Sequence, residues 1–180
     1  LNMENAVLIT TAAAVAICDA IEKFTNEVPR IKWVNDIFIG DRKVCGILTE
    51  AVTNFESGMM ESVIVGIGIN VKTKNEDFPL ELQDTAGSIF NDDDTFIRNQ
   101  LAAEIINNVL KISMTLEDKS FMQIYKERSL ILGEQILYKK NNNWYEGQAL
   151  DIDDFGGLVV YTSDGQKITL NSGEVSIKKK

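Results

Sequence analysis

The chain has 180 residues, of which 44% are hydrophobic and 25% charged, enough for one good core and a small second one. Its net charge is −9 and its basic cluster is the tail Lys178-Lys179-Lys180, so we expect no nucleic-acid binding by this chain. It contains no histidine, which excludes His-dependent triads and most zinc sites from this chain.

The two cysteines, Cys18 and Cys45, have neither metal-ligand spacing nor the pattern of a disulfide framework. We interpret both as small buried hydrophobes in a protein of a reducing compartment, and therefore expect a cytoplasmic location. The apolar stretch 6–21 contains Thr10, Thr11 and Asp19 and is too short and polar for a membrane span. No signal peptide is recognisable, and we expect no membrane association.

The first predicted element is a helix from Glu4 to about Phe24. Alanines are frequent in this stretch. Apolar residues or threonine recur at helical spacing, at Val7, Thr11, Ala14, Cys18 and Ile21. This pattern predicts a helix that is buried on most sides.

A compact run of strands follows the helix. Ile31 and Trp33 alternate with Lys32, Asn35-Asp36 marks a turn, and a second apolar run occupies 37–39. Residues 40–43 form a hairpin signal before a third strand at 44–52. This geometry brings a carboxylate, a carboxamide and one or two lysines to one end of a small sheet.

The next predicted strand, 62–71, has two unlike faces. Val65, Ile67 and Ile69 fall on one side, whereas Gly66, Gly68 and Asn70 fall on the other. Glycine within a strand marks a place where a ligand or another backbone comes close. From the residues alone, a bound ligand and a tightly packed helix are equally good explanations.

The pattern changes near Leu130. Before it come a polar loop at 72–84, a short extended piece at 85–89, a helix from Asp94 to about Leu116 and a shorter helix at 120–128. After it, five short alternating runs predict a small antiparallel barrel at 135–138, 144–150, 158–162, 167–170 and 175–177. We predict two domains, 1–130 and 131–180.

Three blocks in order strongly resemble the catalytic domain of biotin protein ligases: Lys32-Trp33-Val34-Asn35-Asp36, residues 41–50, and Gly66-Ile67-Gly68-Ile69-Asn70. Val34 stands where the family usually has proline. The family's arginine- and glycine-rich biotin loop has no counterpart before Lys32, so we expect an N-terminally incomplete domain. The implied fold is an α/β (α+β) catalytic layer domain of the biotin/lipoate ligase type, followed by a small all-β Src-homology-3-like barrel.

The resemblance implies a two-step reaction with ATP, Mg²⁺ and biotin. The biotin carboxylate attacks the α-phosphorus of ATP, and a lysine of a biotin carboxyl carrier protein then attacks the mixed anhydride. Lys43 is the implied catalytic cation, although most turn lysines are merely solvated. Asp36 is the implied Mg²⁺ ligand, and it also suits an Asx-turn. The implied substrate-binding residues are Lys32, Asn35, Gly46, Gly66, Gly68 and Asn70. The alternatives are pairing with a carboxylate for Lys32, turn-fixing hydrogen bonds for Asn35, packing for the glycines and a strand-end cap for Asn70.

Two classes of function stay open at this stage. The first is a biotin--protein ligase, or a related ligase for another carboxylic acid such as lipoate. The second is a non-catalytic module of the same fold that binds a carrier protein or a second copy of itself as a homodimer. The absent biotin loop favours the second class for this chain alone, whereas Lys43, Asp36 and Asn70 favour the first.

Overall fold

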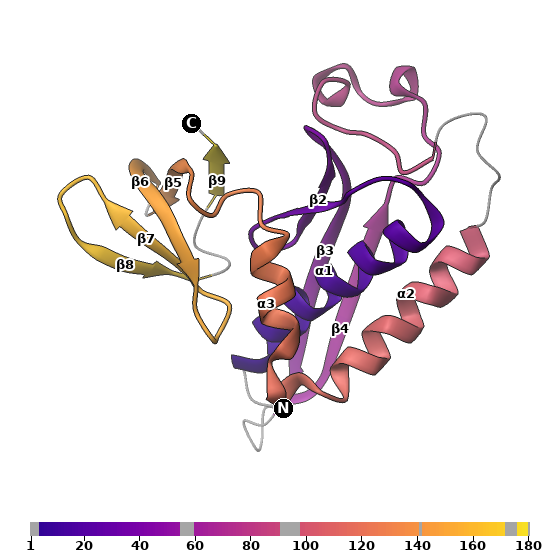
Figure 1. Cartoon of the computed structure of the whole chain (residues 1–180), viewed down its shortest axis with the longest axis horizontal. Helices are drawn as coiled ribbons and strands as arrows, with labels where there is room; N and C mark the ends of the chain where they lie inside the picture. Colours follow the sequence, from indigo (N-terminus) through magenta and orange to yellow (C-terminus); the bar gives the residue numbers. More distant parts are fainter. Residues whose placement is uncertain (1–3, 55–59, 91–97, 141, 172–175, 180) are drawn as a thin grey trace.

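The computed structural model describes residues 4–54, 60–90, 98–140, 142–171 and 176–179. The chain forms a four-stranded sheet with a layer of helices on one face, and a five-stranded sheet further along (Figure 1). The elements of the first part are α1 (Glu4–Phe24), β1 (Arg30–Lys32), β2 (Asp36–Ile39), β3 (Arg42–Thr53), β4 (Met60–Ile69), η1 (Asn75–Asp77), η2 (Leu80–Leu82), α2 (Arg98–Ser113), η3 (Leu116–Asp118) and α3 (Ser120–Glu127). This confirms the predicted α+β class.

Helix α1 is the centre of the helical layer; it is described from Glu4 and ends at Phe24, as the sequence predicts. It lies between α2 and α3 and packs on β3 (Figure 1). From Ala12 to Ile21 every residue except Asp19 is buried, because alanines let neighbouring elements approach on several sides. Thr10 donates a hydrogen bond to the hydroxyl of Thr49 on β3 at 2.7 Å, which fixes the helix over the sheet.

The first sheet is antiparallel throughout, in the order β1-β2-β3-β4. Ile37, Cys45 and Ile47 point to the helices and are at most 2% exposed, whereas Leu48 is 63% exposed on the other face. One row of register partners crosses all four strands: Lys32 opposite Asp36, Asp36 opposite Gly46, and Gly46 opposite Gly68. The strand pairing therefore aligns residues that are far apart in the sequence.

The segment after β4 turns back and runs beside the start of β3. The amide of Lys43 donates to Thr85 O at 2.7 Å, and the amide of Gly87 donates to Lys43 O at 2.9 Å. Beyond it, the amide of Ile89 donates to Asn70 O at 3.0 Å. The short extended piece predicted at 85–89 thus pairs with the hairpin strand, and the two 3-10 turns η1 and η2 lie in the loop before it (Figure 1).

The second sheet is formed by β5 (Gln135–Lys140), β6 (Asn143–Ile152), β7 (Leu158–Thr162), β8 (Lys167–Leu170) and β9 (Ser176–Lys179). Its order is β8-β7-β6-β5-β9, with every pair antiparallel. The predicted small all-β unit is confirmed.

Three side-chain contacts attach the second sheet to the first part of the chain. The indole Nε1 of Trp33 donates to the carbonyl of Gly156 at 2.9 Å, in a buried position. Lys126 of α3 forms an ion pair with Asp151 at 2.8 Å, and the ammonium of Lys119 lies 4.5 Å from the Phe155 ring centre. The β6–β7 connection therefore contacts the same Trp33 that stands between Lys32 and Asp36.

Some predicted boundaries differ from the structure. The hairpin turn consists of Gly40 and Asp41 alone, because Arg42 and Lys43 already pair with β2. Helix α2 is described from Arg98, so the predicted cap at Asp94 lies outside the described residues. At its end, α2 stops at Ser113 and a separate 3-10 turn contains Leu116. Across the described part of the chain, no helix is long and apolar enough to cross a membrane.

Candidate active site

A cavity of about 760 Å³ lies between the row of register partners that runs from Lys32 to Gly68 and the loop segment 78–86. The sheet contributes its floor and the segment 78–86 contributes a wall. The lining residues are Lys32, Asp36, Phe38, Asp41, Lys43, Cys45, Gly46, Gly68, Ile69, Asn70, Phe78, Leu82, Thr85 and Ala86. The structure therefore brings six of the eight predicted site residues to one cavity.

Lys43 and Asp36 form an ion pair on the floor of this cavity. Lys43 Nζ lies 2.6 Å from Asp36 Oδ1, and their side chains are 42% and 24% exposed. Gly46 explains how the pair fits on the sheet, because a Cβ at this position would lie 3.3 Å from Lys43 Nζ and 3.6 Å from Asp36 Oδ1. The absence of a side chain at Gly46 thus leaves room for this ion pair on the sheet.

The glycines of β4 are open to solvent. A Cβ on Gly68 would have Gly46 O at 3.8 Å as its nearest neighbour, and a Cβ on Gly66 would have Leu48 O at 3.6 Å. Among the described residues, no helix atom lies within 4 Å of either ideal Cβ, so the helix-packing explanation of these glycines is wrong. Gly68 lines the cavity, whereas Gly66 does not. Asn70 lies at the cavity end of the strand, where its amide N–H donates to Val44 O at 2.9 Å.

Lys32 and Asn35 have different surroundings. Lys32 lines the cavity, and its ammonium lies 5.8 Å from the ring centre of Phe38. The carboxamide of Asn35 donates to Ile47 O at 2.7 Å, and Ile47 N donates to Asn35 O at 3.0 Å. Asn35 does not line the cavity and fixes the turn against β3.

The thiol and the phenol nearest to the site are buried. Burial, helped by the Asp36 carboxylate, raises the pKa of Cys45 to about 12, so its thiol remains protonated at neutral pH. Burial also raises the pKa of Tyr125, whose hydroxyl donates to Val34 O at 2.9 Å. Neither group is available as a nucleophile or a base, which leaves the charged groups of the cavity for the chemistry. Cys18 is likewise buried, as predicted.

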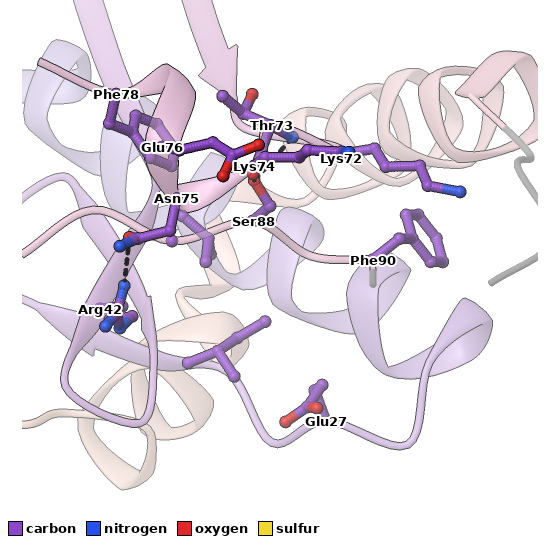
Figure 2. A pocket seen from close by; sticks show the side chains of 13 residues that line it. Glu27, Arg42, Lys72, Thr73, Lys74, Asn75, Glu76, Phe78, Ser88 and Phe90 are labelled. Carbon is purple, nitrogen blue, oxygen red and sulfur yellow. Dashed lines mark hydrogen bonds between the residues drawn. The ribbon is translucent and has the colours of Figure 1, made fainter. Parts of the chain in front are cut away.

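A second cavity, of about 610 Å³, is next to the first and shares Phe78 with it (Figure 2). It is lined by charged residues of both signs, among them Glu27, Arg42, Lys72, Lys74 and Glu76. Apart from Phe78 it has no lining residue in common with the first cavity, and none of the eight predicted site residues lines it.

Comparison with known proteins identifies the family. The model of the "Biotin/lipoate A/B protein ligase family" matches residues 2–70, and that of the "Biotin protein ligase C terminal domain" matches residues 131–178. The chain belongs to the biotin protein ligase family. The first match includes Lys43, Asp36 and all of β4, and the second includes the five-stranded sheet except Lys179, the last residue of β9.

Similar proteins carry related names. The chain is 35% identical over 172 residues to a "Bifunctional ligase/repressor BirA" of Bacillus subtilis, covering 88% of this chain and 50% of that protein. It is 26% identical over 177 residues to a "Biotin--[acetyl-CoA-carboxylase] ligase" of Mycobacterium tuberculosis, covering 93% of this chain and 61% of that protein. The chain thus spans about half the length of the curated relatives it matches.

The fold also matches a solved structure of the family. The biotin protein ligase of Aquifex aeolicus in complex with biotin and ATP superimposes with a TM-score of 0.80 at 23% identity, covering 99% of this chain and 74% of that one. At this identity the likeness establishes the fold.

The loop wall contains lining residues that sequence reasoning missed. Phe78 and Leu82 come from the polar segment 72–84, which reads as an ordinary surface loop. Thr85 and Ala86 come from the short extended piece predicted at 85–89, and Asp41 comes from the hairpin turn. One signal was present: Phe78 and Leu82 are large apolar residues in a segment otherwise rich in charge. A loop that keeps apolar residues near a predicted site is a candidate wall of that site.

The donor groups of the cavity fit the magnesium ion expected in this family. Asp36 and Asp41 both line it, and Mg²⁺ commonly takes one or two carboxylates together with substrate phosphates and waters. Among the described residues there is no group of three or more His, Cys, Asp or Glu that could enclose a metal ion. Asp36 and Asp41 are thus the carboxylates that would hold the ion, and phosphate and water would supply most of its other ligands.

Proposed function

We propose that the chain is the ATP- and biotin-binding part of a biotin--protein ligase, which forms biotinyl-adenylate and transfers biotin to a lysine of a biotin carboxyl carrier protein. The observation that carries this proposal is the Lys43–Asp36 pair lying across Gly46 on the cavity floor, within a chain of this family. We do not propose a repressor activity for this chain, because its net charge of −9 predicts no surface for binding nucleic acid.

The chemistry needs a fixed cation more than a base. A carboxylate oxygen of biotin bonds to the α-phosphorus of ATP while the bond to the pyrophosphate oxygen breaks, so two anions must approach each other. Lys43 lies on the floor where its ammonium can stabilise the charge that develops on the α-phosphate oxygens. In the second step a lysine amine attacks the anhydride carbonyl, AMP leaves, and the amine loses its proton.

The other residues of the row have supporting roles in this proposal. Gly68 leaves the strand surface bare for the nucleotide, and Asn70 offers both a donor and an acceptor to the adenine edge. Asp36 orients Lys43 through the ion pair and would also hold Mg²⁺, which would neutralise charge on the phosphates. A carboxylate has two oxygens and can contact both cations.

Replacement of Lys43 by Met tests the proposal. Met keeps much of the stem and removes the ammonium, so the rate of adenylate formation should fall by roughly a hundred- to a thousandfold, equal to about 2.7 to 4 kcal/mol. Stability should change little, because the side chain is 42% exposed. Lys111→Met, on the exposed face of α2, is the matched control and should keep the parent rate.

The measurement is single-turnover formation of biotinyl-adenylate at saturating ATP and biotin, with lipoate in place of biotin as a second substrate. It is run on the 180-residue chain and on the chain joined to the part of the Bacillus subtilis relative outside the alignment, since the chain spans half of that relative. A drop of less than about threefold in Lys43→Met would make Lys43 an ordinary turn lysine. Faster turnover of lipoate would reassign the substrate.

A further inference from the structure

The side chain of Arg42 connects the β2–β3 hairpin, which carries Lys43, to the loop 74–86, which forms one wall of the first cavity. Arg42, directly before Lys43, donates from Nη1 to Asn75 Oδ1 at 2.7 Å, to Gln83 O at 2.9 Å and to Ala86 O at 3.3 Å. Figure 2 shows Arg42 and Asn75 facing each other across the edge of the second cavity. These acceptors lie in η1, just after η2, and in the returning segment, so one guanidinium contacts three parts of the loop.

The loop has little apolar packing to hold it in place. Leu80 is 84% exposed and Leu82 is 44% exposed, although both lie in or beside the wall. Segments with few buried apolar contacts open at low free-energy cost. Polar contacts such as those of Arg42 therefore determine the position of this loop to a larger extent than they would in the core.

Gly87 provides independent evidence that the loop is packed on Arg42. A Cβ at this position would lie only 2.8 Å from the Cβ of Arg42, a distance that requires the backbones to shift apart. The amide of Gly87 also donates to Lys43 O at 2.9 Å. Gly87 at the end of the loop is thus in direct contact with both Arg42 and Lys43. The contact with Arg42 requires glycine at this position, because a side chain would collide with the Arg42 Cβ.

From these contacts we propose that Arg42 is a positioning residue, which holds the loop 74–86 against the hairpin so that Phe78 and Leu82 form the nucleotide-facing wall of the cavity. The proposal rests on the proposed function, because it assigns the cavity to ATP. Arg42 lines the second cavity and not the first, so it acts on the nucleotide through the loop.

The test combines hydrogen exchange with ATP affinity on the 180-residue chain. In Arg42→Ala, the amides of Leu82, Thr85 and Ala86, which are hydrogen-bonded within the loop, should exchange faster. ATP affinity by calorimetry should fall roughly tenfold, as expected when hydrogen bonds from a charged group are lost. Arg42→Lys should be intermediate, because one ammonium cannot reproduce the guanidinium fork.

Two further variants separate positioning from general weakening. Asn75→Ala removes one acceptor, so its effect should be smaller, and it should add nothing in the Arg42→Ala background because Asn75 acts through Arg42. Asn75→Asp turns this hydrogen bond into an ion pair with Arg42 and should keep or improve ATP affinity. Additive effects of the two alanine variants would overturn the proposal. Gly87→Ala should resemble Arg42→Lys and replaces Arg42→Ala if that variant does not fold.

Arg30→Ala is the matched control. Arg30 is also an exposed arginine that donates to backbone carbonyls, Arg128 O at 3.1 Å and Ser129 O at 2.7 Å, but it lines neither cavity. It should leave loop exchange and ATP affinity unchanged. Equal behaviour of Arg30→Ala and Arg42→Ala, or faster loop exchange with unchanged ATP affinity, would overturn the role of Arg42. If the parent chain binds no ATP, the proposed function fails, while selective loop exchange in Arg42→Ala still supports the contact.

Discussion

The two faces of the first sheet are built from the same strands but have opposite character. On the helical face, Ile37, Cys45 and Ile47 are buried against α1, and the hydroxyl of Thr49 bonds to Thr10. On the open face, the alternate positions hold Asp36, Gly46 and Gly68, with Lys43 above them. The buried helical face thus holds the strands in register, and this register in turn brings the cavity residues together on the open face.

The largest expected effect is on stability and distinguishes adjacent residues of β3. Ile47→Ala removes a side chain that is 2% exposed, so the free energy of unfolding should fall by about 3 kcal/mol. Leu48→Ala removes one that is 63% exposed, so the change should stay within about 0.5 kcal/mol. Chemical denaturation of both variants measures the difference. Equal losses would mean that the open face is covered in solution and that the comparison does not hold.

A smaller effect distinguishes two glycines within the open face. Gly68→Val fills space in the cavity and should weaken ATP binding at least about tenfold, or about 1.4 kcal/mol. Gly66→Val adds the same side chain two residues away on the same face of β4. Because Gly66 lies outside the cavity, this variant should keep the parent affinity. Both variants should remain folded, because valine favours strands and neither Cβ meets an atom closer than 3.6 Å. Identical affinities in calorimetry would show that the glycine strand does not face the nucleotide.

The smallest effect concerns an ion pair on the helical side. Arg128 donates to both oxygens of Glu22, at 2.5 and 2.8 Å, and this hydrogen bonding lowers the pKa of Glu22 from its ordinary 4.5. Burial raises the pKa of neighbouring Asp19, which is why Glu22 is the better residue to change. A lowered pKa in the folded state stabilises the fold above pH 4.5, and this contribution is lost as the pH falls through the lowered value.

Glu22→Gln should therefore destabilise the protein by about 0.5 kcal/mol at neutral pH, since the Glu22 side chain is 38% exposed and screened by solvent. The difference from the parent should shrink toward zero as Glu22 becomes protonated in acid. Thermal unfolding across this pH range measures it. A difference that grows in acid would have the wrong sign and would mean that the pair does not favour the carboxylate.

Local sequence patterns predicted most of the elements and six residues that line the first cavity. The spacing of apolar residues predicted α1 at Glu4–Phe24. The alternation along β4 predicted Val65, Ile67 and Ile69 on one face of the strand and Gly66 and Gly68 on the other. These results depend on the 3.6- and 2-residue periods, which are local properties of the chain. The three blocks that resemble the biotin protein ligases are also contiguous in the sequence, so the family could be recognised before any strand was paired.

Which of these residues lie together depends on the tertiary structure. The row from Lys32 through Asp36 and Gly46 to Gly68 depends on strand register, and a shift of one residue would turn every side chain to the other face. It also decided that Asn35 bonds to Ile47 and that Gly66 lies outside the cavity. The loop wall and its contact with Arg42 were not predictable, because the position of a polar loop is set by hydrogen bonds to distant residues, which leave no periodic pattern in the sequence.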